Sequence, residues 1–242
     1  MSELIHLISC PRNISTALMY SFGNRPDTAI VDEPFYGYYL KNYEIDFHPG
    51  TQEIIESMLT DADAIIEEVL FAERPEPYVF VKNMAHHMKG FDLSYTYSCK
   101  NIFLIRNPRQ LIASFSKVIN HPTMDDIGLK REKDLYEEIK LNGHYDPIVL
   151  DTGEVLKDPQ KVLKELCDRL EIPFTEKMLS WDPGPRMEDG VWAPHWYKNV
   201  HQSTGFRPPE ERREIVLSEE LESLYKQVKN YYEALLEKSI KA

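Results

Sequence analysis

The chain has 242 residues, 42% of them hydrophobic and 28% charged, which is typical of one globular domain that buries a sizeable core. A formal net charge of −12 argues against a DNA- or RNA-binding protein, and three scattered cysteines argue against a disulfide framework or a zinc site. The first residues lack the basic region of a signal peptide and no apolar run reaches membrane-spanning length, so we expect a cytoplasmic protein without a membrane span.

The first predicted strand turns directly into the first predicted helix. The apolar run from Leu4 to Ile8 is typical of a buried strand, and helical spacing begins at Ser15. Such a turn directs free backbone N–H groups and the positive end of the helix dipole at one point, which is a ready anion site. Donors from Arg12, Ser15 and Thr16 favour phosphate or sulfate there, and a capped helix beside a solvated arginine is the alternative.

The same turn argues against two common nucleotide sites. The chain contains no Gly-x-x-x-x-Gly-Lys-Ser/Thr, so an ordinary ATP- or GTP-binding P-loop is not expected, and no Gly-x-Gly-x-x-Gly follows the strand. Cys10 has the position of a phosphatase nucleophile, but a phosphatase loop would close with an arginine where Thr16 stands. We expect Cys10 to be a small, packed residue.

Four more strands are predicted along the chain, in alternation with helices. Apolar runs predict strands at 28–31, 78–82, 101–106 and 147–151, and helical spacing predicts helices at 36–43, 51–72, 107–118, 158–170 and 211–238. This alternation predicts an α/β fold with a mainly parallel sheet covered on both faces. Ligands of such sheets lie beyond the carboxyl ends of the strands, where Cys10, Glu33, Lys82 and Arg106 all lie.

Residues 178–206 are dense in tryptophan, tyrosine, proline and histidine. Because aromatic side chains need burial, we expect an ordered, irregular lid or wall here. Several aromatic residues favour a pocket for a small apolar or aromatic alcohol, with ordinary core packing as the alternative: Tyr36, Tyr38, Tyr39, Trp192 and Trp196.

The first turn resembles a loop of the sulfotransferases. Pro11-Arg12-Asn13-Ile14-Ser15-Thr16 is similar to the family's Pro-Arg-Ser-Gly-Thr-Thr, with Asn13 and Ile14 in place of serine and glycine. In that family the loop holds the 5′-phosphosulfate end of 3′-phosphoadenosine-5′-phosphosulfate, PAPS. The resemblance therefore implies that Pro11, Arg12, Asn13, Ile14, Ser15 and Thr16 bind this end of the cofactor.

A second segment, 106–115, resembles the part of the same family that grips the 3′-phosphate of PAPS. Its sequence, Arg-Asn-Pro-Arg-Gln-Leu-Ile-Ala-Ser-Phe, is similar to the family's Arg-Asn-Pro-Lys-Asp-x-x-x-Ser-Tyr. The family's arginine and serine contact this phosphate, and the matched spacing implies the same role for Arg106 and Ser114.

The resemblance also implies catalytic groups. Glu33 follows the second strand, where some sulfotransferases place the base that takes the acceptor's proton; Asp32 could be the inward group instead, or Glu33 could pair with Arg12. Lys82 is similar to a family lysine that neutralises the transferring sulfuryl group or the leaving oxygen, and its alternative is a surface lysine at the strand end.

Three histidines and one serine complete the candidates. Adjacent His86 and His87 would point about 100° apart on a helix, which argues against a shared metal, but either histidine or His201 could be the base. The segment 201–207 resembles the loop that closes over the cofactor and implies Ser203 as a ligand, although the family's Arg-Lys-Gly-x-x-Gly-Asp-Trp version is absent.

Taken as a whole, the resemblance implies a three-layer, P-loop NTPase-like sulfotransferase fold in one domain, residues 1–242. It implies transfer of a sulfuryl group from PAPS to a hydroxyl or amine of a small-molecule acceptor, with 3′-phosphoadenosine-5′-phosphate, PAP, as the product and without a metal. A P-loop nucleotide phosphotransferase and a nucleotide-binding protein that has lost catalysis stay open. The acceptor and the oligomeric state are not predicted.

Overall fold

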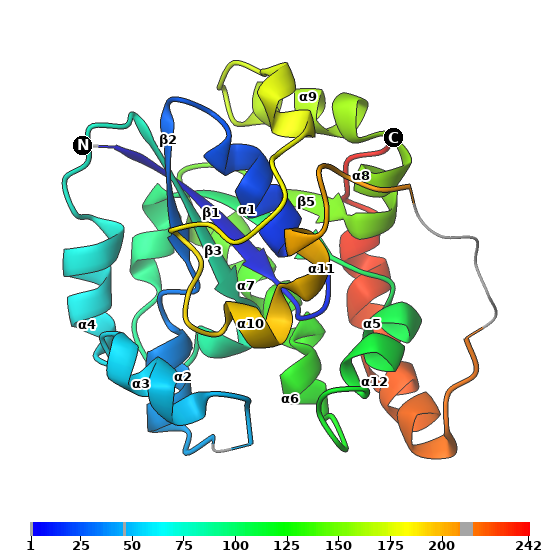
Figure 1. Cartoon of the computed structure of the whole chain (residues 1–242). Coiled ribbons are helices and arrows are strands. Elements are labelled where there is room, and N and C mark those ends of the chain that lie inside the picture. The colour runs from blue at the N-terminus through cyan, green and yellow to red at the C-terminus, as the bar shows by residue number, and fades with distance from the viewer. Residues whose placement is uncertain (1, 46, 209–214) are drawn as a thin grey trace.

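The computed structural model describes residues 2–45, 47–208 and 215–242, and five parallel strands form one sheet at its centre (Figure 1). The strands are β1 (Glu3–Ser9), β2 (Thr28–Asp32), β3 (Tyr78–Met84), β4 (Lys100–Ile105) and β5 (Ile148–Asp151), in the order β2-β3-β1-β4-β5. All neighbouring pairs are parallel. All five predicted strands and the parallel sheet are therefore confirmed, and β3 runs two residues further than expected.

The helices that connect these strands vary widely in length. The α-helices are α1 (Ser15–Gly23), α2 (Tyr36–Asn42), α3 (Thr51–Ser57), α4 (Ala62–Ile65), α5 (Pro108–Phe115), α6 (Met124–Ile127), α7 (Leu129–Asn142), α8 (Thr152–Lys157), α9 (Pro159–Arg169), α10 (Ala193–Trp196), α11 (Lys198–His201) and α12 (Glu219–Leu236). Beside them lie one π-helix, η1 (Ile66–Leu70), and three 3₁₀ turns, η2 (Ala85–His87), η3 (Ser94–Ser98) and η4 (Glu176–Leu179).

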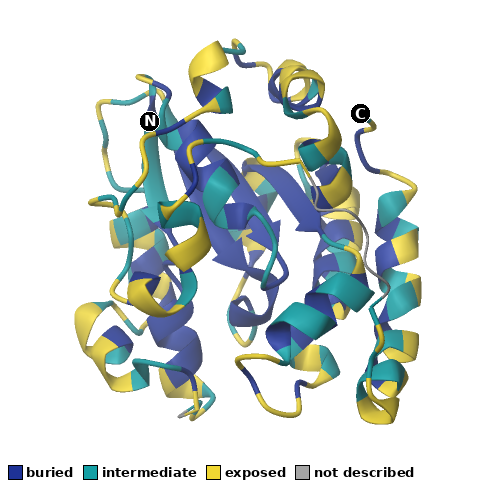
Figure 2. Cartoon of the chain, turned by 45° about the vertical axis from the view of Figure 1, so that its right-hand side comes forward, coloured by how far each residue is buried: buried dark blue, intermediate teal, exposed yellow. Residues whose placement is uncertain are grey.

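Side chains alternate between the two faces of the sheet and build a core on each. On β1, Ile8 packs with the buried side chains of α5, α7 and α12, whereas Leu7 packs with those of α1 and α9. Both faces are thus covered, and the predicted three-layer α/β fold is confirmed. Figure 2 shows the result, with a buried sheet and helices whose exposed residues face outward.

Three predicted helices are wrong in extent. The segment 51–72 is not one helix, because Met58 takes an extended backbone conformation and Asp61 caps a new helix by accepting from the Ala64 amide at 2.9 Å. The helix expected to reach residue 118 ends at Phe115. The last helix begins after its Ser218 cap, and residues 211–214 of the predicted helix lie outside the described residues.

Two further features concern elements that the sequence did not predict. Helix α7 packs on the sheet, but no helix was predicted at residues 129–142. Charged residues separate its apolar positions and obscure their helical spacing. The expected aromatic lid contains the short helices α10 and α11.

No helix among the described residues is both long and apolar enough to cross a membrane.

Candidate active site

The loop from residue 10 to residue 14 is held by its asparagine. The Asn13 Oδ1 atom accepts from the Ser15 amide at 2.9 Å, and its Nδ2 atom donates to the Leu104 carbonyl of β4 at 2.9 Å. Ile14 has an ordinary φ of −95°, and the left-handed residue of the turn is Arg12, with a φ of 56°. This turn therefore needs no glycine at position 14.

The start of the loop is inert. Cys10 is fully buried, and burial raises the pKa of its thiol well above the ordinary value, which disfavours a thiolate. The prediction of a packed Cys10 is confirmed.

Two arginines and a serine meet beside this loop. The Arg12 Nε atom donates to the Ser114 Oγ atom at 3.2 Å, and Arg106 donates to the Arg12 carbonyl. The buried Nε atom of Arg106 has no hydrogen-bond partner, and neither guanidinium pairs with a carboxylate, within the part of the chain that the structure describes. Burial lowers the pKa of both arginines, and the charge of Asp151 opposes this effect at Arg106, so both are partly desolvated cations without a hydrogen-bonded carboxylate. An anion is the partner that such a cluster lacks.

A buried lysine connects the second and third strands. Asp32 lies opposite Lys82 in the register of β2 and β3. The fully buried Lys82 Nζ atom donates to Asp32 Oδ1 at 2.9 Å, to Glu33 Oε1 at 2.5 Å and to the Tyr197 hydroxyl at 2.6 Å. The Tyr197 hydroxyl also donates to Asp32 Oδ2 at 2.7 Å and accepts from Trp192 Nε1 at 2.9 Å. Lys82 is thus no surface lysine.

The two carboxylates of this cluster differ in their environments. Asp32 receives two donors, Lys82 and Tyr197, whereas Lys82 and Tyr197 reach only the Oε1 atom of Glu33. The Oε2 atom lies 3.9 Å from the His87 Nδ1 atom, beyond hydrogen-bond distance. Glu33 also has a left-handed backbone, with a φ of 41°, a strain typical of functional sites.

Burial controls the charges of the cluster. It raises the pKa of the Glu33 carboxyl, while the charge of Lys82 opposes this rise. Burial would lower the pKa of Lys82, but the adjacent carboxylates of Asp32 and Glu33 raise it above its ordinary value. Lys82 therefore stays a cation, and Glu33 is a carboxylate that takes up a proton more readily than an exposed one.

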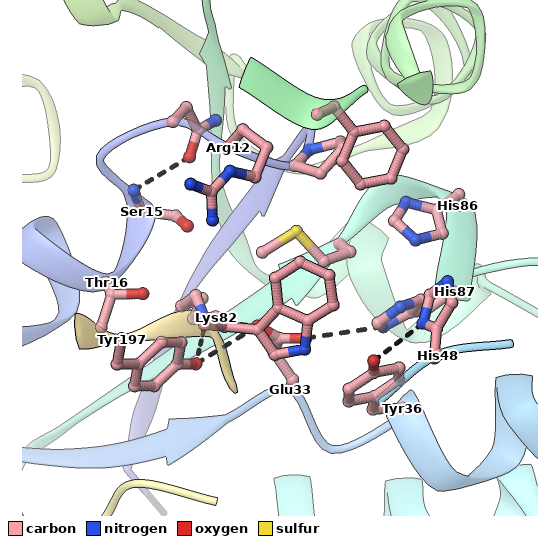
Figure 3. Close-up of a pocket in the computed structure, with 15 residues that line it drawn as sticks. Arg12, Ser15, Thr16, Glu33, Tyr36, His48, Lys82, His86, His87 and Tyr197 are labelled. Carbon is pink, nitrogen blue, oxygen red and sulfur yellow. Dashed lines mark hydrogen bonds and ion pairs between the residues drawn. The ribbon is translucent and has the colours of Figure 1, made fainter. Parts of the chain in front are cut away.

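The loop and this cluster open onto one pocket at the carboxyl ends of the strands (Figure 3). The predicted site residues that line it are Pro11, Arg12, Asn13, Ser15, Thr16, Glu33, Lys82, His86 and His87. Ile14, Asp32, Arg106 and Ser114 do not line it, although Asp32 bonds to Lys82, and Arg106 and Ser114 bond to Arg12. The pocket thus joins an anion loop to a buried carboxylate–lysine pair.

Ser203 and His201 also lie outside the pocket lining. The Ser203 hydroxyl accepts from Trp181 Nε1 at 3.1 Å and donates to the Val200 carbonyl at 2.7 Å. The His201 Nε2 atom bonds to Asp189 at 2.9 Å. Both residues hold the aromatic segment together, and their roles in cofactor binding or proton transfer stay predictions.

Tyr197 and His48 are site residues that the sequence analysis did not single out. Tyr197 reaches Asp32 across 165 positions of the chain, and no spacing in the sequence indicates such a contact. A tyrosine in a segment that must bury its aromatic side chains was the only signal. Of the aromatic residues expected around a pocket, Tyr36 and Trp196 line it, while Tyr38, Tyr39 and Trp192 are packed in the core.

The described residues contain no group of three or more histidine, cysteine, aspartate or glutamate side chains arranged to hold a metal ion.

Comparisons with known proteins bear on this site. A family model described as "Sulfotransferase domain" matches residues 4–239. The chain is 40% identical over 208 residues to "Branched-chain-amino-acid aminotransferase-like protein 1" of Arabidopsis thaliana and 37% identical over 210 residues to its protein 2. Each match covers 86% of this chain and 37% of the relative, so the chain spans little more than a third of the length of these curated relatives.

Solved structures share the fold at low sequence identity. A sulfotransferase from Alicyclobacillus acidocaldarius is 17% identical, with a TM-score of 0.56 over 99% of this chain and 98% of that one. The sulfotransferase domain of the Synechococcus PCC 7002 olefin synthase is also 17% identical, with a TM-score of 0.57 over 95% of this chain and 96% of that one.

Proposed function

Because this chain belongs to the sulfotransferase domain family, we propose that it transfers a sulfuryl group from PAPS to a hydroxyl group of a small-molecule acceptor. The observation that carries the proposal is the shared pocket, in which the anion loop faces the Glu33–Lys82 pair. The three-layer α/β fold with a P-loop-like first turn agrees with this function.

The loop and the arginines suit a donor with an anion at each end. We assign the 5′-phosphosulfate to Arg12, Ser15, Thr16 and the first backbone amides of α1, and the 3′-phosphate to Arg106 and Ser114. Among the described residues, the fit rests on two half-buried guanidiniums without carboxylate partners and on the buried, unpartnered Arg106 Nε atom. When bound, PAPS supplies the sulfuryl group.

We assign the role of the base to Glu33. Asp32 is already held by Lys82 and Tyr197, whereas Glu33 lines the pocket and its Oε2 atom has no hydrogen bond to any residue that the structure describes. Burial lowers the pKa of His86 to about 3 and holds that of His87 well below its ordinary value, so both imidazoles are weak bases.

The remaining steps belong to Lys82 and the loop. The acceptor oxygen forms its bond to sulfur as the bond between sulfur and the 5′-phosphate oxygen breaks, and the acceptor's proton moves to Oε2 of Glu33. Arg12 and the N-terminus of α1 stabilise the charge that builds on the leaving oxygen, which becomes part of PAP. Lys82, whose three N–H donors are taken by Asp32, Glu33 and Tyr197, contributes its positive charge without a direct bond. General-base help of this kind contributes roughly 10²–10⁴-fold to the rate.

The test compares turnover with product binding in Glu33→Gln. We expect turnover with PAPS to fall by roughly 10²–10⁴-fold, while PAP affinity in titration calorimetry stays close to that of the wild type. Glu165→Gln, at an exposed ion pair on α9, is the matched control and should retain turnover. An equal loss of turnover and PAP affinity would remove Glu33 as the base.

The alternatives are separated by ligand choice. A thermal shift with PAP but not with ATP and Mg²⁺ supports the sulfotransferase over a nucleotide phosphotransferase. Sulfuryl transfer from PAPS to any member of an acceptor panel separates an enzyme from a nucleotide-binding protein without catalysis.

A further inference from the structure

The wall of the pocket opposite the anion loop is built from flat rings with polar edges. Figure 3 shows His86, His87, His48 and Tyr36 on the side away from Ser15 and Thr16. We call these four residues and Trp196 the ring wall. They surround the space next to Glu33, where the acceptor would bind.

One ring of this wall is fixed in place. The His87 imidazole stacks on Tyr36 at 4.6 Å and on Tyr39 at 4.8 Å between ring centroids, so it is clamped between two tyrosines. His86 packs edge-on against His87 at 4.4 Å. The two imidazole rings are therefore held next to each other before any ligand binds.

The ring wall carries buried polar atoms without partners. Within the described residues, the Nδ1 atoms of His86 and His87 have no hydrogen bond. Buried polar groups are normally paired, and leaving one unpaired is costly. Two such atoms on one wall favour a ligand that brings its own hydrogen-bonding groups to this end of the pocket.

The charge of this end of the pocket selects against anions. Burial lowers the pKa of His48 to about 4 and that of His86 to about 3, so these rings are neutral at pH 7, as is His87. Lys82 is already shared by two carboxylates, Asp32 and Glu33. An acceptor with a carboxylate or phosphate would meet no free cation at the ring wall.

The pocket is also small, and beside Glu33 it has two polar atoms that a ligand oxygen could bridge. Its volume of about 90 Å³ is several times the roughly 10–15 Å³ needed to hold one water. The 3.9 Å between Glu33 Oε2 and His87 Nδ1 is too long for a direct bond, but a hydroxyl oxygen lying to one side of the line between the two atoms can bond to both.

From these observations, and resting on the function proposed above, we infer that the acceptor is a small uncharged molecule with two adjacent hydroxyl groups. The reacting hydroxyl lies between Glu33 and His87, and its neighbour is bound by the imidazole of His86. A cyclic aliphatic diol and a catechol share this chemistry. His86 is then a specificity-determining residue, and Glu33 remains the base.

The test measures binding of probe compounds to the PAP-loaded protein by titration calorimetry, without any transfer. The pairs are catechol against phenol and cis-1,2-cyclohexanediol against cyclohexanol, with salicylate as the anionic probe. In the wild type we expect the diol of at least one pair to bind about tenfold more tightly than its single alcohol, as one added hydrogen bond allows. A difference within the catechol–phenol pair indicates an aromatic acceptor, and a difference within the cyclohexanediol–cyclohexanol pair indicates an aliphatic one. Salicylate should bind more weakly than catechol.

Variants test the assignment to the ring wall. His86→Phe should reduce the discrimination to below about threefold, whereas His144→Phe, at an exposed histidine far along the chain, should retain it. Equal affinities within both pairs in the wild type, tighter binding of salicylate, or full discrimination in a folded His86→Phe would each overturn the inference. If PAP binds normally while the diols do not discriminate, only this inference fails; if PAP does not bind, the proposed function fails with it.

Discussion

The Tyr197 hydroxyl connects the aromatic segment to the buried ion cluster, and Tyr197→Phe removes only that hydroxyl. In the wild type it bonds to Lys82 at 2.6 Å, to Asp32 at 2.7 Å and to Trp192 at 2.9 Å. Its loss leaves the buried Trp192 Nε1 atom without an acceptor and takes one of two donors from Asp32. A longer contact of 3.3 Å to Glu33 Oε1 is lost as well.

The expected magnitude follows from these bonds. One buried donor without a partner costs about 1–3 kcal/mol, and a lost bond to a charged group costs about 1.5–3 kcal/mol, so we expect about 2.5–6 kcal/mol less stability. For a domain of this size, that lowers Tm by about 5–24 °C at roughly 2–4 °C per kcal/mol. Because the Tyr197 bond lowers the pKa of Glu33, its removal should also move the acid limb of kcat/KM to higher pH.

Thermal unfolding and a pH–rate profile with PAPS measure the two effects. Tyr20→Phe is the matched control, since its buried hydroxyl bonds to Asp189 at 2.7 Å outside the pocket. The control should lose stability and keep the acid limb of the wild type. A Tyr197→Phe protein that unfolds earlier but keeps the wild-type acid limb would refute the link between Tyr197 and the base.

Three further predictions follow from the same geometry. Arg106→Ala should weaken PAP binding by about 1.5–3 kcal/mol in titration calorimetry, as expected for a lost charged hydrogen bond, and unchanged affinity would remove Arg106 from the site. In the wild type, kcat/KM should fall as the pH falls through the pKa of Glu33, which burial raises, so the acid limb should lie above pH 4.5; a midpoint below that value contradicts the assignment of the base. Ile14→Gly should cost about 1 kcal/mol in denaturant unfolding while PAP binding persists, because Ile14 already has an ordinary φ; a gain in stability would contradict this account of the turn.

Much of the fold was predictable because each strand is a short, continuous apolar run between polar turns. The extents of the helices were less predictable from the sequence. The break at Met58 depends on local backbone conformation, and α7 carries a charged residue, Glu132, on its buried side, which obscures its apolar stripe. Side-chain capping and tertiary packing decided both cases.

The site was predictable to the extent that parallel strands end at one edge of the sheet. This rule placed Glu33, Lys82 and Arg106 near one another before their contacts were known. It could not show that Asp32 and Lys82 lie opposite each other, because register depends on pairing across the sheet. Nor could it show that the turn puts its left-handed residue at Arg12, two positions before the residue aligned with the family's glycine.

Lys82 supplies one positive charge for two carboxylates, Asp32 and Glu33, and this has a consequence for the end of a catalytic cycle. Once a neutral alcohol has become a sulfate ester, the proposed base must shed its proton to solvent before it can act again. The restored Glu33 carboxylate then lies beside an anionic product, and two like charges 4 Å apart repel by about 4 kcal/mol at an effective dielectric constant of 20. Resetting the base would therefore also help to drive the ester out, and product departure should quicken as the pH rises.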